Sequence, residues 1–407
     1  MSWRRRYGGN WGRLGLIFEK ATIGDVASVQ TGPFGSQLHN NDYVLVGTPI
    51  VTVEHLGQRK MTRQNLPCVS DTDKLRLNKY WLEYGDLVFS RVGSVDRCSW
   101  VSEDEDGWLF SGRCLRVRPL DKSAVYHKYL YYFFTLDETK NFIRNIAVGA
   151  TMPSINTQLL SEVPISLPAF STQKEIADTL STIDDKIEAN RAINRYLELM
   201  AQVLFAKFME NNSGVPIKLH TLCNFQEGYV NPSQSRPEYF DGTVKWLRAV
   251  DINESYIFDT SRTLTDAGFA SAGKSALLFK PGTIAISKSG TIGRLGLVAD
   301  YMCGNRAVIN ISPHDVNLLP FIYLYLKSRQ AEFLDLAVGS VQKNLYVPLL
   351  QDLDIDLPPR ASVLTFCEKA HPLFEHWKNN VAENHNLAIL RDSLLPRLMS
   401  GEVTITD

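Results

Sequence analysis

The sequence lacks the patterns of membrane-spanning, secreted and metal-binding proteins. No stretch approaches the roughly 18 uninterrupted apolar residues of a membrane-spanning helix. The six cysteines include no Cys-x-x-Cys pair, so neither zinc-finger spacing nor a disulfide framework is indicated. The eight histidines form no His-x-His or His-Glu-x-x-His pair, and we expect no metal site. The basic N-terminus has no apolar signal segment, so we expect a cytoplasmic protein.

Catalytic motifs are missing as well. The chain contains no Asp-Pro-Pro-Tyr or Asn-Pro-Pro-Tyr sequence for amino-methylation, no dinucleotide-binding glycine fingerprint and no nuclease set of carboxylates and a lysine. Residues 268–275 match the G-x-x-x-x-G-K-S phosphate-loop pattern. A phosphate loop joins a buried strand to a helix, but polar residues precede this segment and Pro281-Gly282 follows soon after it. We predict no catalysis by this chain alone, the alternative being a nucleotide-driven switch through Lys274.

Neither sign of charge predominates. Lysine and arginine number 43 against 44 acidic residues, for a formal net charge of −1. Phosphate-binding domains are usually basic, so any nucleic-acid surface must be local or shared with partner chains. The length of 407 residues suffices for two or three domains that each bury a core.

An internal repeat at about half the chain length is the most informative feature. Residues 85–97 (GDLVFSRVGSVDR) recur 197 residues later as 282–294 (GTIAISKSGTIGR). Residues 147–155 (AVGATMPSI) recur 190 residues later as 337–345 (AVGSVQKNL). A long-period repeat of this kind predicts an architecture built twice.

Each half of the repeat has mixed α and β character. The short runs 50–53 and 246–250 predict strands. The aromatic-rich runs 129–134 and 321–326 have a helical rhythm, and we expect them to be buried. The pattern predicts two similar α/β (mixed α+β) domains, at residues 21–168 and 213–358.

A long helix is predicted between the domains, over residues 169–212. Residues 173–210 contain neither proline nor glycine and would form roughly 55 Å of helix. A 4-3 spaced stripe, typical of a coiled-coil seam, runs along it. Two asparagines in that seam cost stability unless they pair with a partner helix, where they would fix the register. The stripe consists of Ile176, Leu180, Ile183, Ile187, Asn190, Asn194, Leu197, Ala201, Leu204 and Phe208.

The C-terminal segment 359–407 supplies a partner helix. Its looser stripe contains Phe366, Ala370, Leu373, Trp377, Val381, Asn384, Leu387, Leu394 and Leu398, and two prolines, Pro372 and Pro396, are expected to reduce its regularity. We predict that the two helices pack as an antiparallel coiled coil that acts as a ruler between the domains. The alternative is that each helix packs only on its own domain.

This plan resembles the specificity subunits of type I restriction-modification enzymes. The resemblance covers residues 21–403 and includes the segment 31–38 (TGPFGSQL), the paired Ser-Arg/Lys-x-Gly-Ser/Thr loops and the segment 173–177 (QKEIA). It implies two target recognition domains, each reading one half of a bipartite double-stranded DNA site, with helices that dock two methylation subunits. The basic extension 1–20, with Arg4, Arg5, Arg6 and Arg13, departs from the family pattern.

The resemblance also implies a division of labour. This chain would be the non-catalytic reader, directing its partners to adenine methylation and ATP-dependent DNA restriction. S-adenosylmethionine, ATP and magnesium would bind the methylation and restriction or motor subunits, with no cofactor bound directly by this chain. The alternative is a two-domain scaffold that gathers proteins without DNA specificity.

The repeated loops are the candidates for phosphate contact. Apolar strand-like residues precede a glycine-containing turn that would expose amides and cations, which suit phosphate oxygens. The alternative is that these loops are only tight turns. The candidates are Ser90, Arg91, Ser94 and Arg97 in the first domain and Ser287, Lys288, Ser289, Thr291 and Arg294 in the second.

Base reading requires side chains that differ between the domains, because Arg, Asn and Gln recognise different base edges in the major groove. The candidates in the first domain are Gln37, His39, Asn40, Asn41 and Arg113. Those in the second are Arg236, Asn305, Arg306, Gln342, Lys343 and Asn344.

Overall fold

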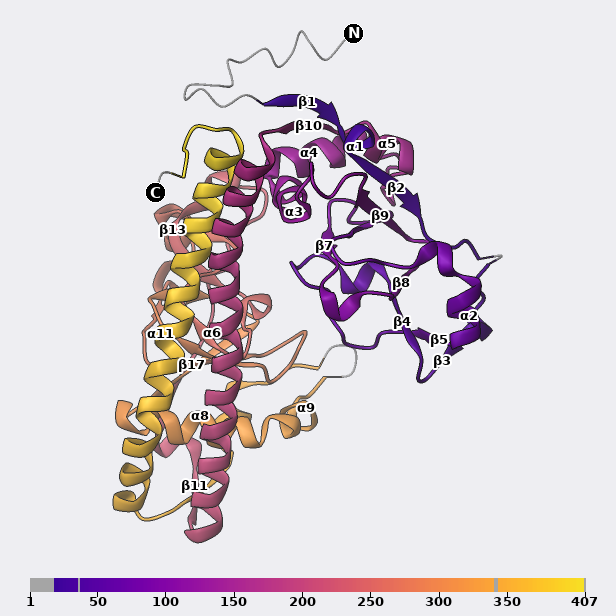
Figure 1. The fold of residues 1–407 in the computed structure, drawn as a ribbon. Helices are drawn as coiled ribbons and strands as arrows, with labels where there is room; N and C mark the ends of the chain where they lie inside the picture. The colour runs from indigo at the N-terminus through magenta and orange to yellow at the C-terminus, as the bar shows by residue number, and fades with distance from the viewer. Residues whose placement is uncertain (1–17, 36, 340–342, 406–407) are drawn as a thin grey trace. The chain divides into compact units, whose positions relative to one another are not determined.

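The computed structural model describes residues 18–35, 37–339 and 343–405, which form two compact units (Figure 1). Unit 1 comprises Met1–Asp185 with Ile389–Asp407, and unit 2 comprises Lys186–Ala388. Two long helices, α6 (Phe170–Asn211) and α11 (Arg360–Met399), each contribute one part to each unit. The arginines of the predicted N-terminal extension and Gln342 lie outside the described residues.

Unit 1 is built on two four-stranded sheets. The first is antiparallel, in the order β2 (Ala27–Thr31), β9 (Cys114–Pro119), β6 (Leu87–Ser90) and β7 (Cys98–Trp100). The second has the order β3 (Tyr43–Val44), β5 (Cys68–Val69), β4 (Thr48–Val51) and β8 (Leu109–Phe110), with β4 and β8 parallel. Strands β1 (Glu19–Thr22) and β10 (Pro164–Leu167) form a separate pair. The shorter helices are α1 (Ile23–Val26), α2 (Asp71–Arg76), α3 (His127–Thr135), α4 (Asp137–Ile146) and α5 (Thr157–Ser161).

Unit 2 repeats this topology. Its main sheet has the order β12 (Cys223–Glu227), β20 (Val308–Pro313), β17 (Thr283–Ser287), β18 (Leu295–Val298) and β14 (Tyr256–Ile257). Its second sheet has the order β15 (Thr263–Leu264), β13 (Phe240–Leu247), β19 (Met302–Gly304) and β16 (Leu278–Phe279), again with a parallel pair, β13 and β19. Strands β11 (Val215–Lys218) and β21 (Asp354–Leu357) pair with each other. The shorter helices are α7 (Asp266–Ala270), α8 (Leu319–Ser328), α9 (Phe333–Leu336) and α10 (Val347–Gln351).

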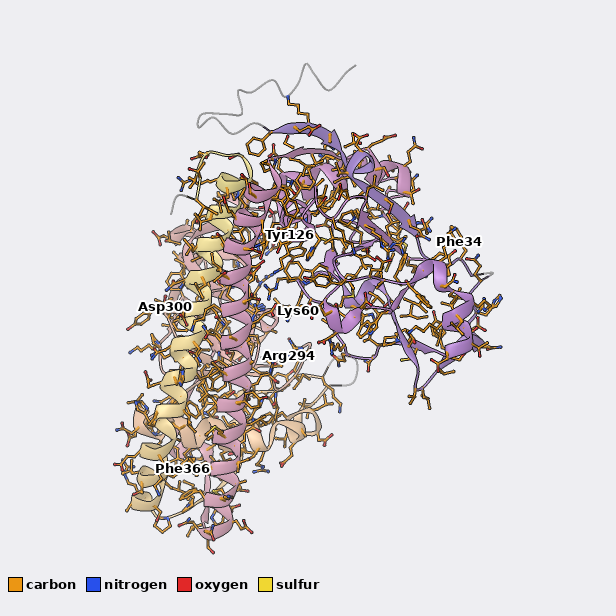
Figure 2. All side chains as sticks on the ribbon, in the orientation of Figure 1. Phe34, Lys60, Tyr126, Arg294, Asp300 and Phe366 are labelled. Carbon is orange, nitrogen blue, oxygen red and sulfur yellow. The ribbon has the colours of Figure 1, made fainter. Side chains whose placement is uncertain are left out.

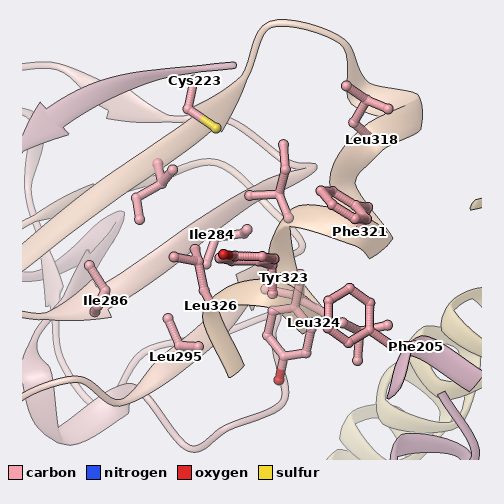
Figure 3. Close-up of a cluster of buried hydrophobic side chains, with 14 of the residues drawn as sticks. Phe205, Cys223, Ile284, Ile286, Leu295, Leu318, Phe321, Tyr323, Leu324 and Leu326 are labelled. Carbon is pink, nitrogen blue, oxygen red and sulfur yellow. The ribbon is translucent and has the colours of Figure 1, made fainter. Parts of the chain in front are cut away.

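The central strand of each main sheet is buried on both faces. Side chains alternate between the faces of a strand, so Leu87 and Phe89 of β6 join one apolar core while Val88 joins another. In β17, Ile284 and Ile286 likewise join the large core shown in Figure 3. The predicted aromatic runs lie on α3 and α8 and are buried, which confirms that expectation.

Helices α6 and α11 pair in an antiparallel arrangement, as predicted. The Nδ2 atom of Asn190 donates to Oδ1 of Asn384 at 3.0 Å, and Nδ2 of Asn380 donates to Oδ1 of Asn194 at 2.9 Å. Asn194 follows Asn190 on α6, whereas its partner Asn380 precedes Asn384 on α11, so the two helices run antiparallel. The alternative in which each helix packs only on its own domain is therefore wrong.

The details of the helix pair differ from the sequence pattern in two respects. Asp184, which the predicted stripe did not include, is buried beside the half-buried Ile183, and its carboxylate accepts hydrogen bonds from Tyr132 and Arg391. Helix α11 also continues through both Pro372 and Pro396, contrary to the expected irregularity. The other predicted seam residues are buried or half-buried: Ile176, Leu180, Ile187 and Leu197 on α6, and Leu373, Trp377, Leu387 and Leu394 on α11.

The two predicted strands end earlier than the sequence indicated. Strand β4 ends at Val51 and β13 ends at Leu247. Each is followed by a 3-10 turn, Val53–His55 in unit 1 and Ala249–Asp251 in unit 2. The residues predicted at the ends of strands therefore belong to turns.

Candidate nucleic-acid interface

The repeated loop joins equivalent strands in both units. It links β6 to β7 in unit 1 and β17 to β18 in unit 2, and the backbone N–H of Ser90 or Ser287 donates to the carbonyl of Arg97 or Arg294 at 2.9 Å in both. Gly93 and Gly290 have φ values of 75° and 77°, which L side chains rarely adopt. The loop conformation thus depends on glycine at the same position twice.

The second repeated motif folds against the first. In unit 1, residues 148–154 form a hairpin through reciprocal backbone hydrogen bonds between Val148 and Ser154, and the N–H of Ile155 donates to the carbonyl of Arg91. In unit 2, residues 338 and 344 pair in the same way, and the N–H of Leu345 donates to the carbonyl of Lys288. Both sequence motifs therefore meet at one place in each unit.

A third segment completes the group. The N–H of Arg91 donates to the carbonyl of Arg113 at 2.8 Å, and the N–H of Lys288 donates to the carbonyl of Ala307 at 2.7 Å. These bonds bring the turns before β9 and β20 beside the loops. We call the three segments of each unit its loop group: residues 90–97, 111–113 and 148–154 in unit 1, and residues 287–294, 305–307, 338–339 and 343–344 in unit 2.

Unpaired cations gather in both loop groups. Arg97 and Arg113 in unit 1, and Arg294 and Arg306 in unit 2, are exposed and form no ion pair with the residues that the structure describes. The Arg97 guanidinium lies against Gly57, where an added Cβ would come 2.6 Å from Nε. Arg97 and Arg294 occupy matched positions, whereas Arg113 and Arg306 lie one residue apart in the equivalent turn. These cations provide local positive charge on a chain whose formal net charge is −1.

The lining of the unit 1 loop group also suits an anion. A hollow of about 510 Å³ is lined by Gly93, Ser94, Arg97 and Arg144, among others. Arg144 is held by Asp96 at 2.5 Å, whereas Arg97 remains available. Guanidinium groups beside a glycine-containing turn are groups that bind phosphate oxygens.

The remaining loop candidates are engaged within the protein. Ser90 and Ser287 are buried, and their hydroxyls donate to carbonyls inside their own loops. The Lys288 ammonium donates to the Glu227 carboxylate and lies over the Tyr346 ring. Burial and the nearby Arg306 lower the pKa of Lys288. These residues shape the loop groups, while Ser94 and Thr291 are exposed and Ser289 is half-buried.

A cleft adjoins the unit 1 loop group. It measures about 580 Å³ and is lined by Phe34, Tyr43, Glu54, His55 and Arg113, among others. Phe34 has an exposed ring (Figure 2). The Arg91 guanidinium lies over this ring, with its carbon 5.7 Å from the ring centroid. The cleft and the loop group are therefore continuous.

The structure places the base-reading candidates in several settings. Gln37 accepts a hydrogen bond from Tyr80, Asn305 accepts one from the N–H of Ala307, and Arg236 donates to Tyr239. Lys343 is exposed and donates to the carbonyl of Leu334. His39 and Asn41 are exposed, Asn344 is half-buried, and Asn40 begins a 3-10 turn.

Sequence reasoning missed Glu54 and Val250, which lie at the same place in the two units. Both are exposed in the 3-10 turns that follow β4 and β13. The run 246–250 predicted a strand, which concealed the turn. The signal that would have found them is the alignment of the two halves, which pairs a carboxylate with an isopropyl group.

The phosphate-loop pattern has a different geometry here. Its residues form the five-residue helix α7 and a 3-10 turn at Gly273–Ser275, with no loop that leads from a buried strand into a long helix. The described residues include no cluster of three His, Cys, Asp or Glu side chains arranged for a metal. Within the same residues, no helix combines the length and apolar character needed to cross a bilayer.

Comparison with known proteins gives a consistent result. Residues 17–199 and 215–362 each match a family model described as "Type I restriction modification DNA specificity domain". The HindI type I restriction enzyme specificity subunit of Haemophilus influenzae is 24% identical over 403 residues, covering 79% of this chain and 87% of that protein. The MjaIX specificity subunit of Methanocaldococcus jannaschii is 26% identical over 313 residues, covering 71% and 72%. The crystal structure of a type I S subunit from M. genitalium shares the fold, with a TM-score of 0.60 at 17% identity over 95% of this chain and 97% of the other.

Proposed function

Because this chain belongs to the type I restriction-modification DNA specificity family, we propose that it reads a bipartite double-stranded DNA sequence, one half-site with each unit. The observation that carries this proposal is the loop group built twice, with two unpaired arginines at each copy. Phosphate contacts position a protein on DNA without reading sequence. A feature present in both units suits that common task.

The function is recognition, not catalysis. The curated relatives are named as specificity subunits of restriction enzymes. We propose that S-adenosylmethionine, ATP and magnesium act on methylation and restriction or motor subunits, which this chain brings to its site for adenine methylation and ATP-dependent restriction. The chain would then act where those partners are, in the cytoplasm.

One face of α6 is suited to docking a methylation subunit. Ile193, Tyr196, Met200 and Val203 recur at intervals of three and four residues and are all exposed. Side chains at this spacing share one side of a helix. The adjacent, seam-forming side, with Asn194 and Leu197, is buried. An apolar helix face beyond the seam offers a partner helix a surface to bury.

A salt titration distinguishes the DNA reader from a protein-only scaffold. The chain reconstituted with its methylation partner should bind its DNA with an affinity that falls steeply as salt rises, because each phosphate contact releases counterions. A complex that assembles fully but shows no salt-dependent DNA affinity would support the scaffold instead. The scaffold hypothesis is disfavoured because it gives no role to the unpaired arginines that recur in both units.

A further inference from the structure

We propose that the turns after β4 and β13 carry a base-reading side chain of each unit. Glu54 accepts a hydrogen bond from the exocyclic amino group of cytosine or adenine, and Val250 packs against the 5-methyl group of thymine. This inference rests on the proposed function and adds which residues distinguish the two half-sites. Carboxylates accept from base amino groups in the major groove, and apolar side chains contact the thymine methyl.

The two turns are equivalent parts of one scaffold. Glu54 is the third residue after Val51, which pairs with Phe110, and Val250 is the third after Leu247, which pairs with Gly304. Each turn is closed in the same way. The N–H of Thr52 donates to Nδ1 of His55 at 3.1 Å, and the N–H of Arg248 donates to Oδ2 of Asp251 at 2.9 Å.

Both turns lie beside the unpaired cations. The N–H of Ser111 donates to the carbonyl of Val51 at 2.8 Å, and the N–H of Asn305 donates to the carbonyl of Leu247 at 3.0 Å. Ser111 and Asn305 begin the turns that hold Arg113 and Arg306. Arginines that bind phosphate would therefore bring the neighbouring turn close to a groove.

The environment of Glu54 favours a base amino group as its partner. Its exposed carboxylate lines the cleft with Arg113 and forms no hydrogen bond or ion pair among the residues that the structure describes. A carboxylate near DNA is repelled by phosphates unless a donor compensates it. Base amino groups are such donors. The same carboxylate therefore favours cytosine or adenine and disfavours a base that offers no amino group.

Val250 occupies the matching place with the opposite chemistry. It is 70% exposed, although the buried core lies only a few residues away at Leu247. No packing requirement explains an isopropyl group there, because the cap of the turn is formed by Arg248 and Asp251. A thymine methyl group is an apolar partner for it within the major groove.

The test compares two reading variants with two controls in cells that also express the methylation partner. The variants are Glu54→Gln and Val250→Ala, and the controls are Glu138→Gln and Val316→Ala, which change an exposed acid and an exposed valine elsewhere. The methylated motif is mapped for each. The purified complexes are then titrated with DNA carrying each of the four bases at the affected positions.

We expect Glu54→Gln to reduce discrimination by about tenfold at one position of one half-site, where the wild-type motif has cytosine or adenine. The base found there tells which amino group is read. Val250→Ala should reduce the preference for thymine by about fivefold at one position of the other half-site. The two controls should leave the motif unchanged.

Two results would overturn the inference. One is an unchanged motif in both reading variants, and the other is a loss spread over several positions or both half-sites. Both side chains are exposed, so folding should be retained, and unfolding curves of the purified complexes verify this. If the wild-type chain itself specifies no bipartite motif, the proposed function fails, which is distinguishable from failure of the two residues alone.

Discussion

Unit 1 and unit 2 share the order of four strands in their main sheets, around a buried central strand, yet their turns expose different chemistry. Gly32 and Gly228 show the shared part, because an added Cβ would lie 2.2 Å from the carbonyl oxygen of Ser111 or Asn305 respectively. Glu54 and Val250 show the divergent part. Close packing fixes interior positions, whereas an exposed turn residue is free to match its ligand.

The segments that lead into the two turns also differ between the units. Leu45, between β3 and β4, is fully exposed, while the matching part of unit 2 is the continuous strand β13, with exposed Asp241 at φ 62°. The same sheet arrangement therefore presents a different exposed surface in each unit. The loop groups, by contrast, keep their cations in both units. This is expected if the loop groups position the DNA and the turns read its sequence.

The largest expected effect comes from exchanging a whole domain. Replacing residues 21–168 with the same domain of a relative should change one half-site completely and leave the other intact, because each unit has its own sheets and loop group. Mapping of the methylated motif measures this. Altered recognition of both half-sites would contradict the proposal that each unit reads its half-site independently.

Removing the loop cations should weaken binding without changing the motif. Arg113 and Arg306, which the sequence predicted as base readers, are assigned here to phosphate contact because they lie in the loop groups of both units. Arg97→Ala with Arg113→Ala, or Arg294→Ala with Arg306→Ala, should reduce affinity by about tenfold or more and lower the salt slope by about two. Titrations at several salt concentrations measure both quantities. Lys274→Ala is the control, because Lys274 is exposed and lies in the phosphate-loop pattern, outside both loop groups. An equal loss in that control would argue against a local DNA surface.

Each unit anchors its aromatic helix to α6, but with different strength. In unit 1, Asp184 accepts from Tyr132 at 2.6 Å and from Arg391 at 2.7 Å, and in unit 2, Lys327 pairs with Glu198 at 3.4 Å. Asp184→Ala should lower the free energy of unfolding by about 2 kcal/mol, since it leaves the Tyr132 hydroxyl without its acceptor and leaves Arg391 only its pair with Asp392. Glu198→Ala should cost about 1 kcal/mol. Denaturant unfolding measures both, and equal losses would contradict this ranking.

Acid should destabilise unit 1 through His127. Burial, with the charges of Lys128 and Lys122, lowers the pKa of this histidine to about 4. Between pH 6.5 and 4 the unfolded chain binds a proton that the folded unit does not, so stability falls as pH falls through this window, by roughly 3 kcal/mol. Hydrogen exchange of α3 amides at several pH values measures it. His127→Gln should flatten that pH dependence, and an unchanged slope would exclude His127 as its source.

The sequence predicted those features that repeat or follow a strict period. The heptad spacing around Asn190 and Asn194 indicated a partner helix, and the asparagine pairs in the structure provide it. The duplicated loop motifs predicted two similar domains, although not that the two motifs of each half would meet. That contact joins segments far apart in the chain, such as Arg91 and Ile155.

Other features depend on tertiary contacts that periodicity does not encode. Asp184 lies outside the predicted apolar stripe and is nevertheless buried, because Tyr132 and Arg391 supply its hydrogen bonds. Gln173, in the first turn of α6, is buried, and its side-chain amide donates to the carbonyls of Ala124 and Pro168. Which loop residues contact DNA stays a prediction, because several of them, including Lys288, already have partners within the protein.

The most direct test of the account is a map of methylated bases across the genome in cells that carry this chain and its methylation partner, compared with cells that lack only this chain. We expect a two-part methylated motif in the cells that carry this chain and no such motif in the cells that lack it. An unchanged methylation map, with the partner and the assembled complex verified, would contradict it.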